Sequence, residues 1–406
     1  MTETMNLHNG IRIHQIYESK FNEVLVNLKI SFPLKPYQNT MTQLLIRMLG
    51  DRTATYPTKK LMQERLDTMY GASVRINSYA LGENQIIDMS VKAINSEFVK
   101  EDLLELQCEL LAEFLYNPLF NESLLNEAKR DLLMYHSRIK ENTASYAQIQ
   151  AFKHAAKGQI FEINSIGEAE DVLKVSLEEL KDFHQLIVNS FAKDIYIVGH
   201  QKSLDDFSMF SKGHGDLLSK SLNETVVNPG YMEQTHAGNQ TELIQVYSTD
   251  IDPHHELYEA FLVFVAILGQ LPSSYLFRYI REEQSLAYRI FASRQVFDGV
   301  MYIGTSISDK NLELTQTLIK EQFDKIANED IEILGAIEFL SSNLQSTSEN
   351  LKSIGDFCYR NEVLQDTTTI EGVIEKIQKV TVDQVKEVLN HISEPFIFAY
   401  RGDKHE

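Results

Sequence analysis

The sequence predicts an α+β fold made of two duplicated half-domains, each a mainly antiparallel sheet flanked by helices. At 406 residues the chain is too long for one typical hydrophobic core. Its strand-like segments come in neighbouring pairs that are followed by runs of helices, an order that suits an antiparallel sheet better than a doubly wound parallel one. The same order of segments then occurs a second time, which predicts the duplication.

The first half begins with two strand-like runs, at 11–16 and 24–32, broken afterwards by Pro33 and Pro36. Between Met41 and Leu49 the apolar residues fall at i, i+3, i+4, i+7 and i+8, the pattern of an amphipathic helix. A capping box at 176–179 predicts the start of a later helix. The remaining expected elements are a helix at 59–69, strands at 73–79 and 85–93, helices at 101–115, 123–139, 145–157 and 177–188, and a buried strand at 194–200.

The second half follows the same order. We expect strands at 241–248, 288–295, 300–308 and 396–400, and helices at 255–268, 273–284, 312–326, 330–342 and 348–363. The predicted boundaries are 1–211 for the first half and 240–406 for the second. Between them, 212–239 is rich in Gly, Ser, Asn and His and lacks sustained periodicity, so it is expected to be a linker.

One section of the two halves aligns without gaps at a shift of 215 positions. This shift pairs Leu66 with Arg281 and Ser73 with Tyr288. A repeat of this length indicates a duplicated domain rather than a short-period solenoid.

Composition excludes several classes of function. The formal net charge is −20, with 58 acidic and 38 basic residues, which argues against nucleic-acid binding because phosphates need clustered Lys and Arg. The two cysteines, Cys108 and Cys358, lack metal-binding spacing and indicate buried thiols in a reducing compartment. The longest apolar run, 260–269, has the length of a buried core helix, so no membrane partner is expected and the location is predicted to be cytoplasmic.

The segment 273–288 changes from a helical to an alternating pattern. Its helical part ends at Arg281, and Tyr288 stands at the start of a strand, on the same expected face as Leu286 and Ile290. Taken alone, these residues also fit an exposed helix end followed by an ordinary aromatic strand residue.

The duplicated α+β half, together with the sequence R-E-x-x-x-L-A-Y at 281–288, resembles the inverzincin metallopeptidases. This is the family of pitrilysin, insulinase and the mitochondrial processing peptidase. In size and order the chain is most similar to the zinc-less, YfmF-type members found in Gram-positive bacteria. The family carries His-x-x-Glu-His on its first long helix, because two His four residues apart can bind one zinc while the Glu beside them activates water.

By this resemblance the zinc motif falls on 43–47, where its ligands are missing. Gln43 is a poor zinc ligand, Ile46 cannot act as a base, and Arg47 places a permanent cation where the metal would lie. The distal acidic ligand would fall in 124–136, which still offers Glu127 and Asp131. We therefore expect no metal and no cofactor in this chain, with zinc held by a partner subunit.

The resemblance also implies a role for Arg281 and Tyr288. In the family this pair comes from the second half, contacts the substrate backbone and stabilises the oxyanion of the tetrahedral intermediate. Some bacterial members divide the zinc motif and the Arg/Tyr pair between two chains. The chain is thus expected to be the zinc-less subunit of a heterodimeric peptidase, inactive alone, with a paralogous zinc-bearing subunit and a peptide substrate as its partners.

Other hypotheses stay open at this point. The chain could be a non-catalytic peptide-binding or scaffold protein in a peptide maturation or protein-modification pathway, with Arg281 and Tyr288 unused. A self-sufficient hydrolase is disfavoured because no G-x-S-x-G or similar nucleophile motif occurs. The sequence also leaves open whether the isolated chain forms a homodimer.

Overall fold

The computed structural model describes residues 2–200, 206–215 and 222–403, and the chain divides into two compact units. The first unit consists of Met1–His136, Ser165–Ser221 and Thr347–Asp366, and the second of Ser137–Asn164, Leu222–Ser346 and Thr367–Glu406. Each unit therefore contains a segment from the other half of the sequence. The boundaries at 211 and 240 remain a prediction about where the two sequence halves meet. The packed units do not follow these boundaries, because each unit includes one segment from the other half.

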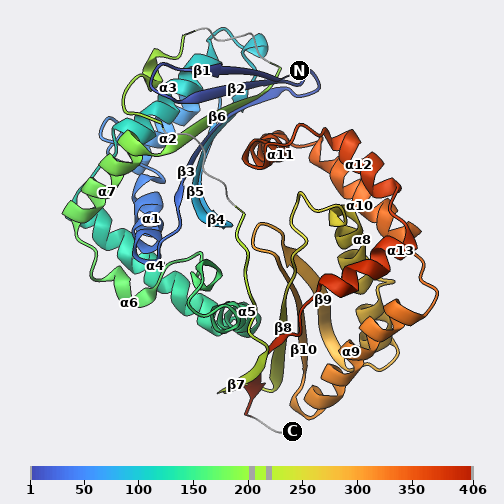
Figure 1. The fold of residues 1–406 in the computed structure, drawn as a ribbon. Helices are drawn as coiled ribbons and strands as arrows, with labels where there is room; N and C mark the ends of the chain where they lie inside the picture. Colours follow the sequence, from blue (N-terminus) through green and yellow to red (C-terminus); the bar gives the residue numbers. More distant parts are fainter. Residues whose placement is uncertain (1, 201–205, 216–221, 404–406) are drawn as a thin grey trace. The chain divides into compact units, whose positions relative to one another are not determined.

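The first unit is built on a six-stranded sheet with the order β1-β2-β6-β3-β5-β4 (Figure 1). Its strands are β1 (Thr2–Asn6), β2 (Arg12–Tyr17), β3 (Glu23–Pro33), β4 (Ser73–Leu81), β5 (Asn84–Ile94) and β6 (Ala192–Gly199). Only the β2–β6 pair is parallel among these described strands. The expected α+β class with a mainly antiparallel sheet is confirmed for this unit.

Helices pack on both faces of this sheet. One face carries the main core, to which α1, α3, α4 and α7 contribute apolar side chains, and the other face is covered by α11. The helices are α1 (Pro36–Leu49), α2 (Lys59–Thr68), α3 (Leu103–Tyr116), α4 (Glu122–Glu141), α6 (Ala169–Val172), α7 (Leu177–Ser190) and α11 (Leu351–Leu364). Helix α1 begins at Pro36, earlier than expected, because proline is well tolerated in the first turn of a helix.

The second unit has a five-stranded sheet with the order β7-β11-β8-β10-β9. The strands are β7 (Gly230–His236), β8 (Gln240–Ser248), β9 (Ala287–Gln295), β10 (Val300–Ser308) and β11 (Phe396–Gly402). This order repeats β2-β6-β3-β5-β4 of the first unit, with the parallel pair β7–β11 in the place of β2–β6. Strand β7 lies inside the range expected to be a linker.

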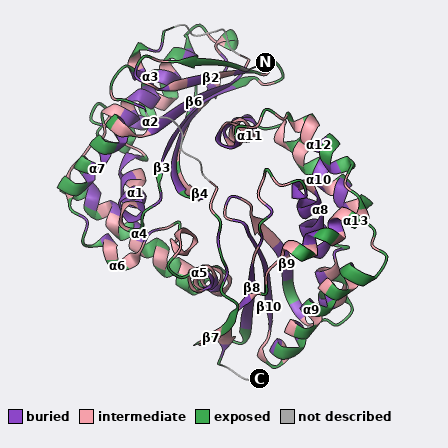
Figure 2. Cartoon of the chain, in the orientation of Figure 1, coloured by how far each residue is buried: buried purple, intermediate pink, exposed green. Residues whose placement is uncertain are grey.

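The helices of the second unit again cover both sheet faces. Figure 2 shows α8 and the strands β8 and β10 as largely buried. On the other face, Ala147, Ala151 and Ala155 of α5 pack against β8 and β11 in a separate apolar cluster. The helices are α5 (Thr143–Ala155), α8 (Tyr258–Gly269), the π-helix η4 (Phe277–Glu282), α9 (Leu312–Asn328), α10 (Leu334–Thr347), α12 (Ile370–Gln378) and α13 (Val382–Glu387). Short 3₁₀ turns are η1 (Ser96–Phe98), η2 (Ile160–Glu162), η3 (Ser208–Phe210), η5 (Asp309–Asn311) and η6 (Val388–His391).

Strand register confirms the predicted duplication. In the first unit Ile76 of β4 lies opposite Met89 of β5, and in the second unit Phe291 of β9 lies opposite Gly304 of β10. Both residues of the second pair stand 215 positions after their counterparts, which is the shift found by aligning the sequence.

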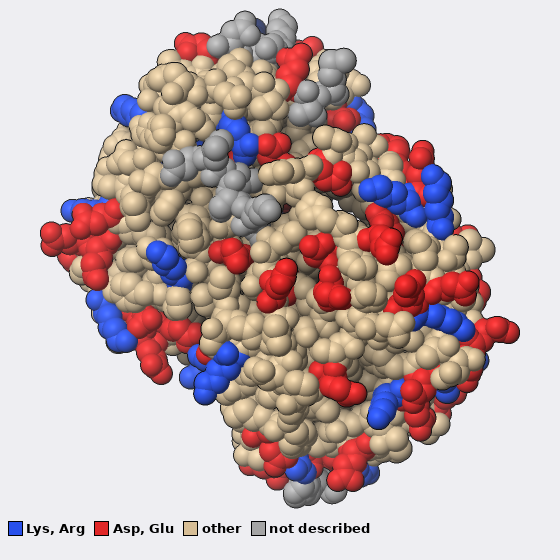
Figure 3. Space-filling view, viewed as in Figure 1, with Lys and Arg blue, Asp and Glu red and all other residues tan. Residues whose placement is uncertain are grey.

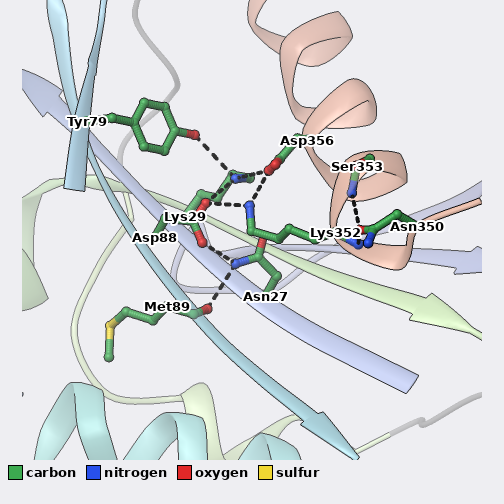
Figure 4. A network of polar contacts seen from close by, with 9 residues as sticks. All are labelled: Asn27, Lys29, Tyr79, Asp88, Met89, Asn350, Lys352, Ser353 and Asp356. Atoms are coloured by element: carbon green, nitrogen blue, oxygen red, sulfur yellow. Dashed lines mark hydrogen bonds and ion pairs between the residues drawn. The ribbon is translucent and has the colours of Figure 1, made fainter. Parts of the chain in front are cut away.

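The face of the first sheet beneath α11 is polar and charged (Figure 4). Lys29 is fully buried, and its Nζ lies 2.6 Å from Oδ2 of Asp88 and 2.7 Å from Oδ1 of Asp356 on α11. Lys352 of α11 approaches the same two carboxylates, at 2.8 Å from Asp88. Burial would lower the pKa of Lys29 and raise that of Asp88, but the opposite charges reverse both effects: the pKa of Lys29 is raised and that of Asp88 lowered.

Within the described residues, no helix combines the length and the apolar character needed to cross a membrane.

Candidate functional site

The helix expected to carry the zinc motif is α1, and its motif positions make protein contacts. Gln43 is buried, and its Nε2 donates a hydrogen bond to the carbonyl oxygen of Ser165 at 2.9 Å. Arg47 lies in the last turn of α1, and its Nη1 donates to the backbone carbonyl of Gln43 at 2.7 Å and to Oε1 of Gln43 at 3.0 Å. Ile46 is half-buried and packs against the core. All three side chains therefore belong to the packing of α1.

The guanidinium of Arg47 faces α4, where the distal ligand was expected. Its Cζ lies 5.6 Å from the ring centroid of Tyr135, and the negative charge of Asp131 interacts favourably with the guanidinium. Burial lowers the pKa of Arg47, while Tyr135 and Asp131 partly offset this effect. A fixed cation thus lies between α1 and α4, with an aromatic face and a carboxylate beside it.

The other distal candidate, Glu127, is held by basic side chains. Its Oε2 lies 2.9 Å from Nη2 of Arg52, and its Oε1 lies 3.4 Å from Nζ of Lys59. In the part of the chain that the structure describes, no three His, Cys, Asp or Glu side chains are arranged to hold a metal ion. The residues at 43–47 and 127–131 therefore do not fit a zinc ion.

In the second unit, Arg281 lies on a π-helix rather than on the regular helix expected at 273–284. In η4 the N–H of Glu283 donates to the carbonyl of Arg278, five residues earlier, at 2.9 Å. Buried Ile280 anchors this turn in the core. Arg281 is exposed, with its Cζ 4.6 Å from the ring centroid of Phe277. Within residues 222–403 its guanidinium makes no hydrogen bond or ion pair, so its donors are available to a ligand.

Tyr288 stands on a second irregularity, a β-bulge in β9. Arg289 lies opposite Ser306 and Ala287 lies opposite Ile307, so Tyr288 is the extra residue between them. The expected alternation placed Tyr288 on the same face as Ile290, and that prediction is wrong because the bulge turns the side chain outward. Ile290 is buried, whereas Tyr288 is 69% exposed.

The first unit provides an internal comparison for this corner. Leu66, the counterpart of Arg281, lies in the regular helix α2, and Ser73, the counterpart of Tyr288, pairs with Lys92 without a bulge. Ser285 has a left-handed backbone, with φ of 53°, and its counterpart Tyr70 has φ of 57°, so this turn is common to both copies. The π-helix and the bulge are particular to the second copy, where they present Arg281 and Tyr288 to solvent.

The structure brings Arg281 and Tyr288 to one corner, where η4 leads into β9. No hydrogen bond or ring contact joins the two side chains among the described residues. Among the described strands, β9 is the edge of its sheet and pairs with β10 alone, so its outer backbone groups can pair with an added strand. An exposed guanidinium, an exposed phenol and a free strand edge form a set of hydrogen-bond donors next to a site for extended peptide.

A hydroxyl, an imidazole and a carboxylate lie in series in the first unit, and the sequence analysis missed them. Oγ1 of Thr4 lies 3.1 Å from Nδ1 of His14, whose Nε2 lies 2.9 Å from Oδ1 of Asp194. The guanidinium of Arg12 shares this carboxylate at 2.7 Å, and the ring of His14 stacks on Tyr196. Because the carboxylate of Asp194 is shared with Arg12, which also pairs with Glu362, we interpret the series as part of a structural ion-pair network.

Charged side chains are distributed over the visible face of the molecule. Figure 3 shows acidic side chains spread over the visible face, with Lys and Arg scattered among them rather than gathered in one patch. This distribution matches the net charge of −20.

Comparisons with known proteins show what this chain is similar to. Residues 174–332 match the family model described as "Peptidase M16 inactive domain". A relative from Bacillus subtilis (strain 168), named "Probable inactive metalloprotease YmfF", is 24% identical over 401 residues, covering 95% of this chain and 94% of the relative. The expected subgroup was of the YfmF type, whereas the relative found is named YmfF.

Solved structures share the fold over the full length. A conserved protein from Enterococcus faecalis V583 superimposes with a TM-score of 0.93 at 22% identity, covering 100% of this chain and 99% of that one. A peptidase M16 inactive domain from Pseudomonas fluorescens gives a TM-score of 0.83 at 18% identity, again covering 100% and 99%. The predicted fold class is thus confirmed by both units and by these relatives.

Proposed function

We propose that this homologue of the M16 peptidases is the zinc-less subunit of a heterodimeric peptidase. In this proposal a paralogous, zinc-bearing subunit supplies the metal and the water-activating base. This chain supplies Arg281 and Tyr288, which complete the partner's active site for cleavage of peptides. Alone, the chain is inactive.

The observation that carries this proposal is the contrast between the two candidate sites. At 43–47 the side chains of Gln43, Ile46 and Arg47 are used in packing and internal hydrogen bonds. At the η4–β9 corner, Arg281 and Tyr288 are exposed and their polar groups are available. An exposed Arg and an exposed Tyr contribute little to packing, so two such side chains held out by a π-helix and a bulge support a role in binding.

The role proposed for Arg281 and Tyr288 in peptide hydrolysis follows from the hydrogen bonds that their side chains can donate. In peptide hydrolysis the carbonyl oxygen gains negative charge as water attacks. The guanidinium of Arg281 and the phenol of Tyr288 would donate hydrogen bonds to the substrate and to that oxygen, and donors placed before the reaction stabilise its transition state. The open edge of β9 would hold the peptide in extended form by strand addition.

We further propose a reducing, cytoplasmic location. Both cysteines are free: Cys108 is buried and Cys358 half-buried, and burial raises the pKa of both thiols. Free thiols of this kind are common in reducing compartments.

We expect the isolated chain to bind less than stoichiometric zinc and to cleave no peptide, because no zinc ligands are arranged on α1. The measurement is metal content by mass spectrometry after the chain has been loaded with zinc and dialysed against zinc-free buffer, with peptide hydrolysis followed in the same sample. A paralogue that carries His-x-x-Glu-His serves as the positive control. One zinc per chain, held against dialysis, would contradict the proposal.

Mixing this chain with such a paralogue tests the heterodimer. We expect a complex on size exclusion and peptide hydrolysis by the mixture. Peptide binding without turnover, despite formation of the complex, would favour the alternative of a non-catalytic peptide-binding or scaffold protein.

A further inference from the structure

A cavity of about 510 Å³ lies in the second unit, between the sheet and helix α9. We name it the β8–α9 pocket. It is lined by Gln245 and Tyr247 of β8, by Ile397 of β11, by one side of α9 and by residues between 389 and 395. Among the described residues, none from the η4–β9 corner lines this pocket, so it is distinct from that corner.

Gln245 is a polar side chain in an otherwise apolar row. Side chains alternate along a strand, so Leu243, Gln245 and Tyr247 point to the same side of β8, and Leu243 and Tyr247 belong to the main core of the second unit. Gln245 is only 3% exposed. Burial of an amide costs free energy unless its polar atoms are hydrogen-bonded, so each of these atoms requires a partner.

Tyr247 satisfies one end of this amide and leaves the other end free. The hydroxyl of Tyr247 donates a hydrogen bond to Oε1 of Gln245 at 2.5 Å. Nε2 of Gln245, which carries two N–H groups, has no hydrogen-bond partner within the described residues. Because Gln245 lines the pocket, a ligand with an acceptor oxygen can satisfy these donors. The bond from Tyr247 holds the amide in the orientation that presents them.

The hydroxyl of Tyr247 stays protonated, as this arrangement requires. Burial raises the pKa of Tyr247, and the negative charge of Glu394 raises it further. The hydroxyl therefore continues to donate its hydrogen bond to Gln245 at neutral pH and well above it.

The other groups that line the pocket are mainly apolar. The rings of Tyr247 and Phe323 lie with their centroids 5.5 Å apart, at an angle of 30°. Leu389, Ile392 and Ile397 add aliphatic surface. Flat rings pack well against such side chains, and the volume of the cavity is within the range of about 300–1,000 Å³ that is usual for small-molecule sites. The pocket therefore suits an aromatic ligand.

The charged side chains of the pocket favour a neutral ligand. Lys320, Asp324 and Glu394 line it; all three are exposed, and none forms an ion pair within the described residues. An anion would meet two carboxylates and a single ammonium group, so anionic ligands are disfavoured. A cation would leave the N–H donors of Gln245 without an acceptor. A neutral molecule with an acceptor oxygen avoids both penalties.

We propose that the β8–α9 pocket binds a neutral aromatic molecule that carries a carbonyl group, such as an aryl amide. Nε2 of Gln245 donates a hydrogen bond to the carbonyl oxygen, and the ring packs against Phe323 and the aliphatic side chains. Tyr247 is a positioning residue, since its hydroxyl orients the amide of Gln245. This binding goes beyond the proposed function and does not depend on peptide cleavage.

The test is a titration of the full chain with benzamide, followed by ligand-detected NMR. Benzoate and benzylamine have the same ring and nearly the same size, but they carry a negative and a positive charge at neutral pH. We expect benzamide to bind with a Kd of about 1 mM, a typical affinity for a ligand of so few atoms. The two charged compounds should bind at least about tenfold more weakly.

Two substitutions test the hydrogen bonds. Gln245→Met keeps the length of the side chain but removes both N–H donors, so it should weaken binding of benzamide by about twofold to tenfold, the loss of one neutral hydrogen bond. Tyr247→Phe removes only the orienting hydroxyl, so the amide of Gln245 can turn and present Oε1 to the pocket. It should therefore narrow the ratio between the affinities for benzamide and benzylamine, which a loss of stability alone does not change.

Two tryptophan substitutions test the location. Ala327 is exposed on α9 and lines the pocket, so the indole of Ala327→Trp fills part of the cavity and should abolish measurable binding. Leu314→Trp is the matched control, because Leu314 is 49% exposed on the same helix and lies outside the described lining. This control should bind benzamide as the wild type does.

No measurable binding of benzamide would overturn the proposal and indicate that water alone satisfies the donors of Gln245. Equal affinities for the three compounds, or an unchanged affinity in Ala327→Trp or in folded Gln245→Met, would overturn it as well. If Gln245→Met does not fold, the two tryptophan variants decide, since both replace exposed residues. Because no zinc subunit is present, the outcome is independent of whether the mixed enzyme is active.

Discussion

We expect Arg281→Ala to lower kcat of the mixed enzyme by about 10²–10³, the usual effect of losing one oxyanion donor. The reason is that the guanidinium of Arg281 makes no hydrogen bond or ion pair within the described residues, so its N–H donors are available for charge that forms in the transition state. We expect Tyr288→Phe, which removes only the phenol oxygen, to have an effect of the same order. The measurement is steady-state hydrolysis of a quenched fluorescent peptide by saturating amounts of both subunits.

The same π-helix contains a matched control for Arg281. Arg278 is also exposed, but its Nε lies 3.3 Å from Oε1 of Glu283, so its guanidinium is already in an ion pair. Arg278→Ala should leave kcat within about twofold of the wild type, since an exposed ion pair contributes little. An equal loss of activity in the Arg278 and Arg281 variants would show that substitution damages η4 generally and would contradict a direct role for Arg281.

Lys29→Met should destabilise the first unit by about 3 kcal/mol, at the low end of the range for breaking a buried ion pair. The substitution keeps most of the side-chain volume but leaves the buried carboxylate of Asp88 without its nearest cation, at 2.6 Å. Lys352 still lies 2.8 Å from this carboxylate, which limits the loss. The free energy of unfolding in urea, followed by circular dichroism, measures the effect.

Lys20→Met is the control for this change, because the pair of Lys20 with Glu349 is exposed on both sides, at 40% and 72%. It should cost less than about 1 kcal/mol. Equal losses for the Lys20 and Lys29 variants would contradict the account of the buried network.

The effect of Lys29→Met should depend on pH in a defined direction. The pKa of Asp88 in the folded protein is lowered below its usual 3.8, so its contribution is present above that value and is lost as the pH falls through the folded pKa. The pKa of Lys29 is raised above its usual 10.5, so its contribution is present below that value and is lost at higher pH. The difference between wild type and variant should therefore be constant between these values and shrink below pH 3.8.

Periodicity accounts for what could be predicted from the sequence. The apolar pattern of 41–49 located the helix α1. The resemblance to the metallopeptidase family, and not this pattern, assigned Gln43, Ile46 and Arg47 to the zinc-motif positions. The gapless shift of 215 anticipated the matching registers of β4–β5 and β9–β10. These features depend on neighbours along the chain or on a repeat within it, which a single sequence contains.

The features that the sequence did not predict depend on contacts between distant segments or on local irregularities of the backbone. The exchange of α5 and α11 between units follows from packing of helix faces onto sheets, which local patterns do not report. The bulge at Tyr288 was hidden because an extra residue reverses the alternation on one side of it.

The central claim is that Arg281 and Tyr288 complete an active site whose zinc is held by a partner. The most direct measurement is kcat of the zinc-bearing subunit mixed with the double variant Arg281→Ala/Tyr288→Phe, once the complex has been verified by size exclusion. We expect the rate to fall to that of the zinc-bearing subunit alone, with the complex intact. A complex that contains the double variant and retains the wild-type rate would contradict the claim.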